Sequence, residues 1–131
     1  MKECLFCKII SGEIPSYTIY ENDLVKVFLD INPTTNGDCL IIPKKHYNNI
    51  VDIDLETLGN INDASKKIYS ILKEKLNCDG ITFIQNNNYG QDIKHYHLHA
   101  TPRYKGDNFI LSSDKKNLLE VEKIFNQIKN N

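Results

Sequence analysis

Short apolar runs separated by turn-forming residues occupy the first third of the chain. Residues 17–20 and 24–30 have the composition of two strands, and residues 21–23 between them, Glu-Asn-Asp, have that of a hairpin turn. Residues 39–42 form a continuous apolar run, which is typical of a buried strand. Ahead of them, residues 4–10 form an apolar turn or short helix. This part of the chain therefore predicts three strands behind a short N-terminal helix.

The middle of the chain has the three-to-four residue spacing of an amphipathic helix. The pattern runs from about Asp54 to Leu76, and residues 77–80, Asn-Cys-Asp-Gly, contain the glycine that commonly ends a helix. The apolar positions are Leu55, Leu58, Ile61, Ala64, Ile68, Ile71 and Leu72. We therefore expect one long helix with a single buried face.

A weaker helical pattern lies near the C-terminus, over about residues 113–129. Leu118, Val121, Phe125 and Ile128 are its apolar positions, and Ser113 or Asp114 can cap it. We expect a C-terminal helix appended to the rest of the chain.

Three of the four histidines alternate with apolar residues just after a predicted strand over 81–84 and a polar loop over 85–90. In an extended strand, alternate side chains share a face, so His95, His97 and His99 are expected to line one surface. Tyr96, Leu98 and Ala100 then face the core. Imidazole is suited to nucleophilic attack, proton transfer and metal ligation near neutral pH, so this strand is the first candidate for chemistry.

Together these elements predict an α+β fold. We expect an antiparallel meander sheet of about five strands packed by one long helix, with a short N-terminal helix and a C-terminal helix. The length of 131 residues fits a single domain over 1–131, with a core at about 4–104 and a helical extension at about 113–129.

Composition narrows the classes of partner. The formal net charge is −1, so no broad basic field indicates nucleic acid or an anionic membrane. There is no apolar signal region at the start and no run of transmembrane length, so we expect a cytoplasmic protein with reduced cysteines. In that setting Cys4-x-x-Cys7 indicates metal binding or redox chemistry before a disulfide.

An amide- and glycine-rich loop directly precedes the histidines. Backbone N–H groups and neutral amides can hold phosphoryl oxygens without a fixed counter-charge. A central histidine can then attack phosphorus while its neighbour steers it. The residues concerned are Asn86, Gly90, Gln91, Asp92, His97 and His99. The alternative is a simple surface turn beside a polar strand face.

Residues 90–100, Gly-Gln-Asp-Ile-Lys-His-Tyr-His-Leu-His-Ala, resemble the signature of the histidine-triad (HIT) family, in which histidines alternate with apolar residues after a Gly-Gln pair. Residues 4–15, 28–33 and 42–46 resemble three further blocks of that family in the same order. The match is best to the Hint-like branch, in its small bacterial members, and covers about residues 4–104.

The resemblance implies roles for individual residues. His97 would be the nucleophile that takes up a nucleoside monophosphoryl group, and His99 would contact the phosphate and orient His97. Asp30 would bind the ribose hydroxyls. Asn86 and Gln91, with the backbone of Asp92, would hold the phosphate. The apolar slot for the base would comprise Leu5, Phe6, Ile9, Ile14, Phe28 and Ile31.

Two features depart from the family pattern. Asp92 stands where the family often has Ser or Thr, so its carboxylate either faces an amine leaving group or points away and offers only its backbone N–H. The loop from Asn86 to Gln91 is also about two residues shorter than usual, which leaves the choice between Asn86 and Asn87 open.

The resemblance also implies a zinc site. Some members use two cysteines and two histidines to hold zinc, and the matching residues are Cys4, Cys7, His46 and His95. Four protein ligands would make the zinc structural. The alternative is a pair of free thiols, since members without the cysteines need no metal.

The resemblance implies a purine nucleotide-binding hydrolase, in which a nucleotidyl-histidine forms and water then releases the nucleoside monophosphate. We expect it to cleave nucleoside 5′-phosphoramidates or related conjugates. One alternative is a dinucleoside polyphosphate hydrolase of the Fhit-like type, which Lys94 favours weakly; another is a nucleotide-binding regulatory module with incidental turnover. A homodimer through the long helix and an edge strand is also implied.

Overall fold

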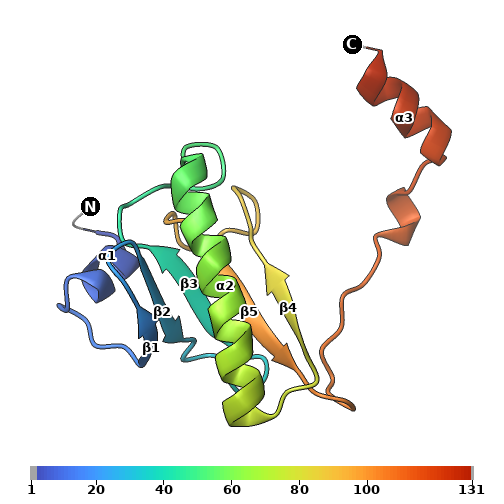
Figure 1. Ribbon diagram of the computed structural model, residues 1–131. Helices are drawn as coiled ribbons and strands as arrows, with labels where there is room; N and C mark the ends of the chain where they lie inside the picture. Colours follow the sequence, from blue (N-terminus) through green and yellow to red (C-terminus); the bar gives the residue numbers. More distant parts are fainter. Residues whose placement is uncertain (1–2, 131) are drawn as a thin grey trace.

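The computed structural model describes residues 3–130 and has the predicted α+β architecture (Figure 1). Residues 1, 2 and 131, which belong to the domain predicted over 1–131, lie outside the described residues. Along the chain the elements are α1 (Leu5–Ile10), β1 (Thr18–Glu21), β2 (Val25–Leu29), β3 (Cys39–Pro43), α2 (Leu55–Leu76), β4 (Gly80–Ile84), β5 (Leu98–Arg103), a 3₁₀ turn η1 (Lys115–Asn117) and α3 (Val121–Lys129).

The five strands form one antiparallel sheet in the order β1-β2-β3-β5-β4. The first three strands follow one another as a meander. Helix α2 then carries the chain across one face, so that β5 enters between β3 and β4 and leaves β4 at an edge. This insertion brings β5, which follows the histidines, next to the apolar strand β3.

Both faces of β2 and β3 are covered, which explains why these strands are apolar at nearly every position. On the face under α2, Val27 and Ile41 pack with Ile61 and Ile68 of the helix. On the opposite face, a second cluster lies around α1 and comprises Phe6, Ile9, Phe28, Leu40 and Ile42. The second cluster lies on the face of the sheet that carries the candidate site.

The long helix begins and ends close to the predicted positions. The Asp54 side chain caps its N-terminus by accepting a hydrogen bond from the Thr57 N–H at 2.8 Å. Asn77 ends it in the left-handed conformation, with φ of 56°. No helix among the described residues is both long and apolar enough to span a membrane.

The predicted start of the histidine strand is wrong, because β5 begins at Leu98 rather than His95. Residues 92–95 form a bend, and the Tyr96 N–H donates to the Tyr47 carbonyl at 2.7 Å instead of joining the sheet ladder. The alternation nevertheless persists, since Tyr96 and Ala100 are buried in the core under α2. Tertiary contacts therefore replace the sheet for the first half of the motif.

The predicted cap and first turn of the C-terminal helix are also wrong. Asp114 precedes the short turn η1, where its carboxylate accepts hydrogen bonds from the Asn117 side chain. Leu118 ends that turn in an extended conformation, and α3 begins only at Val121. The extension is therefore two helical pieces, and its second piece lies well away from the sheet (Figure 1).

Candidate functional site

The histidines form two groups. His95 is fully buried and lies 5.8 Å, between ring centroids, from Phe6. His97 and His99 form an adjacent pair, with centroids 5.0 Å apart and planes at 70°. The Phe6 ring also meets His97 edge-on, at 5.1 Å. Phe6 on α1 therefore packs against a histidine of each group.

A backbone hydrogen bond sets the orientation of His97. Its Nδ1 lies 2.7 Å from the His95 carbonyl oxygen, which can only accept, so Nδ1 carries the proton. Burial lowers the pKa of His97, so the imidazole is neutral near pH 7. The unprotonated Nε2 points the other way, with a carboxylate oxygen of Asp92 at 3.6 Å. This is the arrangement that a histidine nucleophile needs.

A cavity of about 300 Å³ opens beside this pair. Helix α1 contributes Phe6 and Ile9 from one face, since they are three residues apart. The predicted residues that line it are Leu5, Phe6, Ile9, Ile14, Phe28, Asp30, Ile31, Asp92, His97 and His99. Further lining residues, not predicted from the sequence, include Ser16, Asn32, Leu40 and Ile93. The structure thus joins the predicted apolar slot to the histidine pair.

Asp30 lies just beyond β2, at the edge of this cavity. Its Oδ1 accepts a hydrogen bond from the Asn32 N–H at 2.9 Å, which fixes the carboxylate. Among the described residues, no side chain donates a hydrogen bond to Oδ2. Ile31 beside it is 80% exposed and lies at the rim. A fixed carboxylate with one oxygen available suits a pair of hydroxyl donors.

The residues of the predicted phosphate loop differ in whether they reach the cavity. Asn86, Gly90 and Gln91 do not line the cavity. The buried Gln91 side chain donates to the Asn48 carbonyl at 2.6 Å and accepts from the Asn88 N–H at 3.1 Å, so it holds the loop together. Contact between these three residues and a phosphate stays a prediction, and Asp92 is the loop residue that reaches the cavity.

A cluster of side chains that can ligate a metal lies next to the cavity and comprises Cys4, Cys7, His46 and His95. Their sulfur and nitrogen atoms all lie within 4.8 Å of one another. His95 Nδ1 is 3.4 Å from Cys4 Sγ and 3.6 Å from Cys7 Sγ, and His46 Nδ1 is 3.4 Å from Cys7 Sγ. Tetrahedral zinc with its usual bond lengths places S and N ligands about 3.5 Å apart. The cluster therefore has the chemistry and the spacing of a metal site.

Hydrogen bonds behind the cluster hold both imidazoles in the tautomer that a metal needs. His95 Nε2 lies 2.9 Å from the Pro43 carbonyl, and His46 Nε2 lies 3.1 Å from Asn48 Oδ1. If each Nε2 donates, each Nδ1 keeps its lone pair for the cluster. Burial lowers the pKa of His95 to about 4, which also favours the neutral ring. Neither partner was predicted: a backbone carbonyl has no sequence signal, and nothing in the sequence alone pairs Asn48 with His46.

Comparison with known proteins identifies the family. The sequence pattern of the HIT domain matches residues 11–106. The chain belongs to the HIT domain family. An uncharacterized HIT-like protein of Methanocaldococcus jannaschii is 39% identical over 128 residues, which cover 96% of this chain and 98% of the relative.

Solved structures share this HIT fold. SMU.412c of Streptococcus mutans superposes with a TM-score of 0.88 at 34% identity, covering 99% of this chain and 83% of that protein. A zinc-bound histidine triad family protein of Mycobacterium smegmatis superposes with a TM-score of 0.80, also at 34% identity. The match covers 86% of this chain and 84% of that protein.

Two more distant HIT relatives have named activities. The adenosine 5′-monophosphoramidase of Saccharomyces cerevisiae is 38% identical over 102 residues, covering 76% of this chain and 62% of the yeast protein. An adenylylsulfatase of Arabidopsis thaliana is 32% identical over 129 residues, which cover 96% of this chain and 66% of the plant protein. Both names describe enzymes acting on compounds in which AMP carries a further group.

Proposed function

We propose that this HIT protein hydrolyses conjugates of a purine nucleoside 5′-monophosphate, phosphoramidates in particular, through a nucleotidyl-histidine on His97. The carrying observation is the bond from His97 Nδ1 to the His95 carbonyl, which leaves Nε2 as a lone-pair donor beside the cavity. The named activities of the yeast and plant relatives support the same class of substrate.

The cavity provides a place for each part of such a substrate. The base lies between Phe6, Ile9, Phe28 and Ile31, and the ribose hydroxyls donate to Asp30. This puts the 5′-phosphorus near His97 Nε2, with His99 beside it to hold phosphoryl oxygen. His97 attacks phosphorus, the leaving group departs, and water then releases the nucleoside monophosphate. Asn86, Gly90 and Gln91 are proposed to support the phosphate side of the site.

We also propose that Cys4, Cys7, His46 and His95 hold a structural Zn²⁺. Two thiolates and two neutral imidazoles are a preferred ligand set for this ion, and they close the site to substrate. The zinc-bound structure of the Mycobacterium smegmatis relative supports the assignment. Bound zinc would stabilise the junction of α1 with the sheet. A cytoplasmic location and a homodimer stay predictions.

The variant His97→Ala tests the nucleophile. Turnover of an adenosine 5′-phosphoramidate should fall by at least about 10²–10⁴-fold, since covalent catalysis is lost, while binding of AMP survives. Mass spectrometry of wild-type protein quenched during turnover should find a nucleotidyl adduct on the peptide that contains His97.

The variant His99→Ala is the matched control, because it removes the neighbouring imidazole and keeps the nucleophile. It should retain the adduct on His97 even though its turnover is slower. Near-normal turnover by the His97→Ala variant, with a wild-type melting temperature, would refute the proposed mechanism.

A further inference from the structure

We propose that Asp92 selects the leaving group, and that the preferred substrate releases an amine carrying a further positive charge. This inference rests on the proposed function and names the substrate class within it. The residues concerned lie on the Nε2 side of His97, opposite the Nδ1 that bonds to the His95 carbonyl. The departing group lies on that side, beyond the phosphorus.

Asp92 occupies the junction between two depressions. Its Oδ1 lies 3.6 Å from His97 Nε2, and the residue lines the cavity described above. Asp92 also lines an adjoining groove of about 570 Å³. The Ile93 N–H donates to Oδ1 at 2.9 Å and holds the carboxylate in place, while the side chain is 81% exposed and open to a ligand. A group leaving phosphorus away from the nucleotide therefore passes this carboxylate.

The groove places charged side chains beside that group. It is lined by Glu3, Cys4, Leu5, His46, Asn48, Asp92, Ile93 and Lys94. Lys94 directs its ammonium to the carbonyls of Asn88 and Gln91, at 3.2 and 3.1 Å. His46 is held between Cys7 and Asn48. Among the described residues the groove thus holds two carboxylates and one ammonium, and Asp92 is the carboxylate next to His97.

This charge favours one class of bond cleavage. The phosphoramidate nitrogen takes a proton from solvent, His97 Nε2 bonds to phosphorus, and the P–N bond breaks with its electron pair on nitrogen. The departing amine donates an N–H hydrogen bond to Asp92, and a second cationic centre on it gains attraction in the groove. Water then adds to phosphorus, the Nε2–P bond breaks, and the water proton returns to solvent. An anionic leaving group, such as a polyphosphate, is repelled at the same place.

Two leaving groups of similar size but opposite charge provide the test. AMP joined through a P–N bond to ethylenediamine leaves as a cationic amine, and AMP joined to β-alanine leaves as an anionic one. We expect the kcat/KM ratio of the first to the second to fall about five- to tenfold in the Asp92→Asn variant, since exposed ion pairs are individually modest. In the wild type the ratio should also shrink as salt is raised, and less so in the variant.

The variant Asp23→Asn is the matched control. It removes one exposed carboxylate from the turn between β1 and β2, outside both the cavity and the groove, and should leave the ratio unchanged. Turnover by the wild type with the same ratio in the Asp92→Asn variant would overturn this inference alone. Absence of turnover on both compounds would instead overturn the proposed hydrolase.

Discussion

At the scale of single residues, hydrogen bonds to backbone carbonyls give His95 and His97 different orientations. The Pro43 carbonyl meets His95 Nε2 and directs Nδ1 to the cysteines, whereas the His95 carbonyl meets His97 Nδ1 and directs Nε2 to the cavity. The two rings are two residues apart and use opposite nitrogens. One histidine therefore faces the cysteines and the next faces the cavity.

The variant Gln91→Ala distinguishes a role of the Gln91 amide in holding the loop from a role in binding phosphate. If Gln91 mainly holds the loop, its loss removes two hydrogen bonds, one to the Asn48 carbonyl and one from the Asn88 N–H. Since each such bond contributes about 0.5–1.5 kcal/mol, the free energy of unfolding should fall by about 1–3 kcal/mol without nucleotide. Denaturant unfolding measures this.

The variant Gln127→Ala removes an exposed amide from α3 and is the control, with an expected change within about 0.5 kcal/mol. Unchanged stability of the Gln91→Ala variant together with a raised KM would indicate that the amide serves the phosphate instead.

At the scale of elements, α1 is the part of the fold that needs outside support. It has six residues, and an isolated helix of that length is unstable in water. Phe6 and Ile9 bury one side of it, and Cys4 and Cys7 join it to His46 and His95. The same short helix and its N-cap Cys4 therefore carry both a wall of the cavity and the two cysteines of the cluster.

The variant Cys7→Ser tests the metal at this junction. Wild-type protein purified without added metal should contain one zinc per chain, and the variant should contain much less. Because a metal bound only by the folded state stabilises it by about 2.7 kcal/mol at a hundred times its Kd, a strong chelator should lower the wild-type melting temperature.

The variant Cys78→Ala is the control, since this buried thiol lies outside the cluster. It should keep its zinc and its sensitivity to the chelator. A zinc content near zero in the wild type, with a melting temperature that the chelator does not change, would contradict the assignment.

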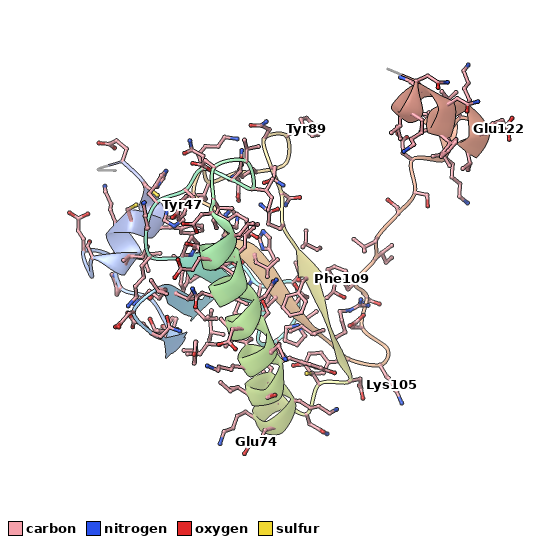
Figure 2. All side chains as sticks on the ribbon, turned by 45° about the horizontal axis from the view of Figure 1, so that its top comes forward. Tyr47, Glu74, Tyr89, Lys105, Phe109 and Glu122 are labelled. Atoms are coloured by element: carbon pink, nitrogen blue, oxygen red, sulfur yellow. The ribbon has the colours of Figure 1, made fainter. Side chains whose placement is uncertain are left out.

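At the scale of the whole molecule, α3 lies apart from the sheet and from α2 (Figure 1). Glu122 on α3 is far from Tyr47 and from the loop tip at Tyr89, as Figure 2 shows. An apolar stripe nevertheless follows one side of α3 at positions i, i+3, i+4 and i+7, comprising Val121, Ile124, Phe125 and Ile128, and most of it is exposed. Such a stripe is typical of a helix that packs on a partner.

We predict that a second copy of the chain covers this stripe, as a contact additional to the homodimer interface implied above through the long helix and an edge strand. The variant Phe125→Asp should then raise the dissociation constant of the dimer at least about tenfold, since burial of a phenylalanine contributes about 1.5–3 kcal/mol. Sedimentation velocity over a concentration series measures this. The variant Glu122→Gln changes charge on the same helix and should leave the dimer intact; equal dissociation constants for the two variants would count against the prediction.

The sequence by itself determined the elements and the chemistry that they carry. Apolar spacing was enough to predict α2 and the strands, because helices and strands bury one face at different periods. The alternation of histidines around His97 indicated the family. The spacing of Cys4 and Cys7 indicated the cluster with His46 and His95. Histidines and cysteines are uncommon at such spacings unless they serve a site.

Only the tertiary structure decided how these residues divide into sites. The sequence predicted a strand at His95, but Tyr96 bonds to the Tyr47 backbone and delays β5 until Leu98. Likewise, Gln91 is held by the distant Asn48 carbonyl, and Asp92 comes within 3.6 Å of His97 through the bend that follows. The physical reason is the same in each case: backbone hydrogen bonds between distant segments depend on three-dimensional packing and have no local sequence signal.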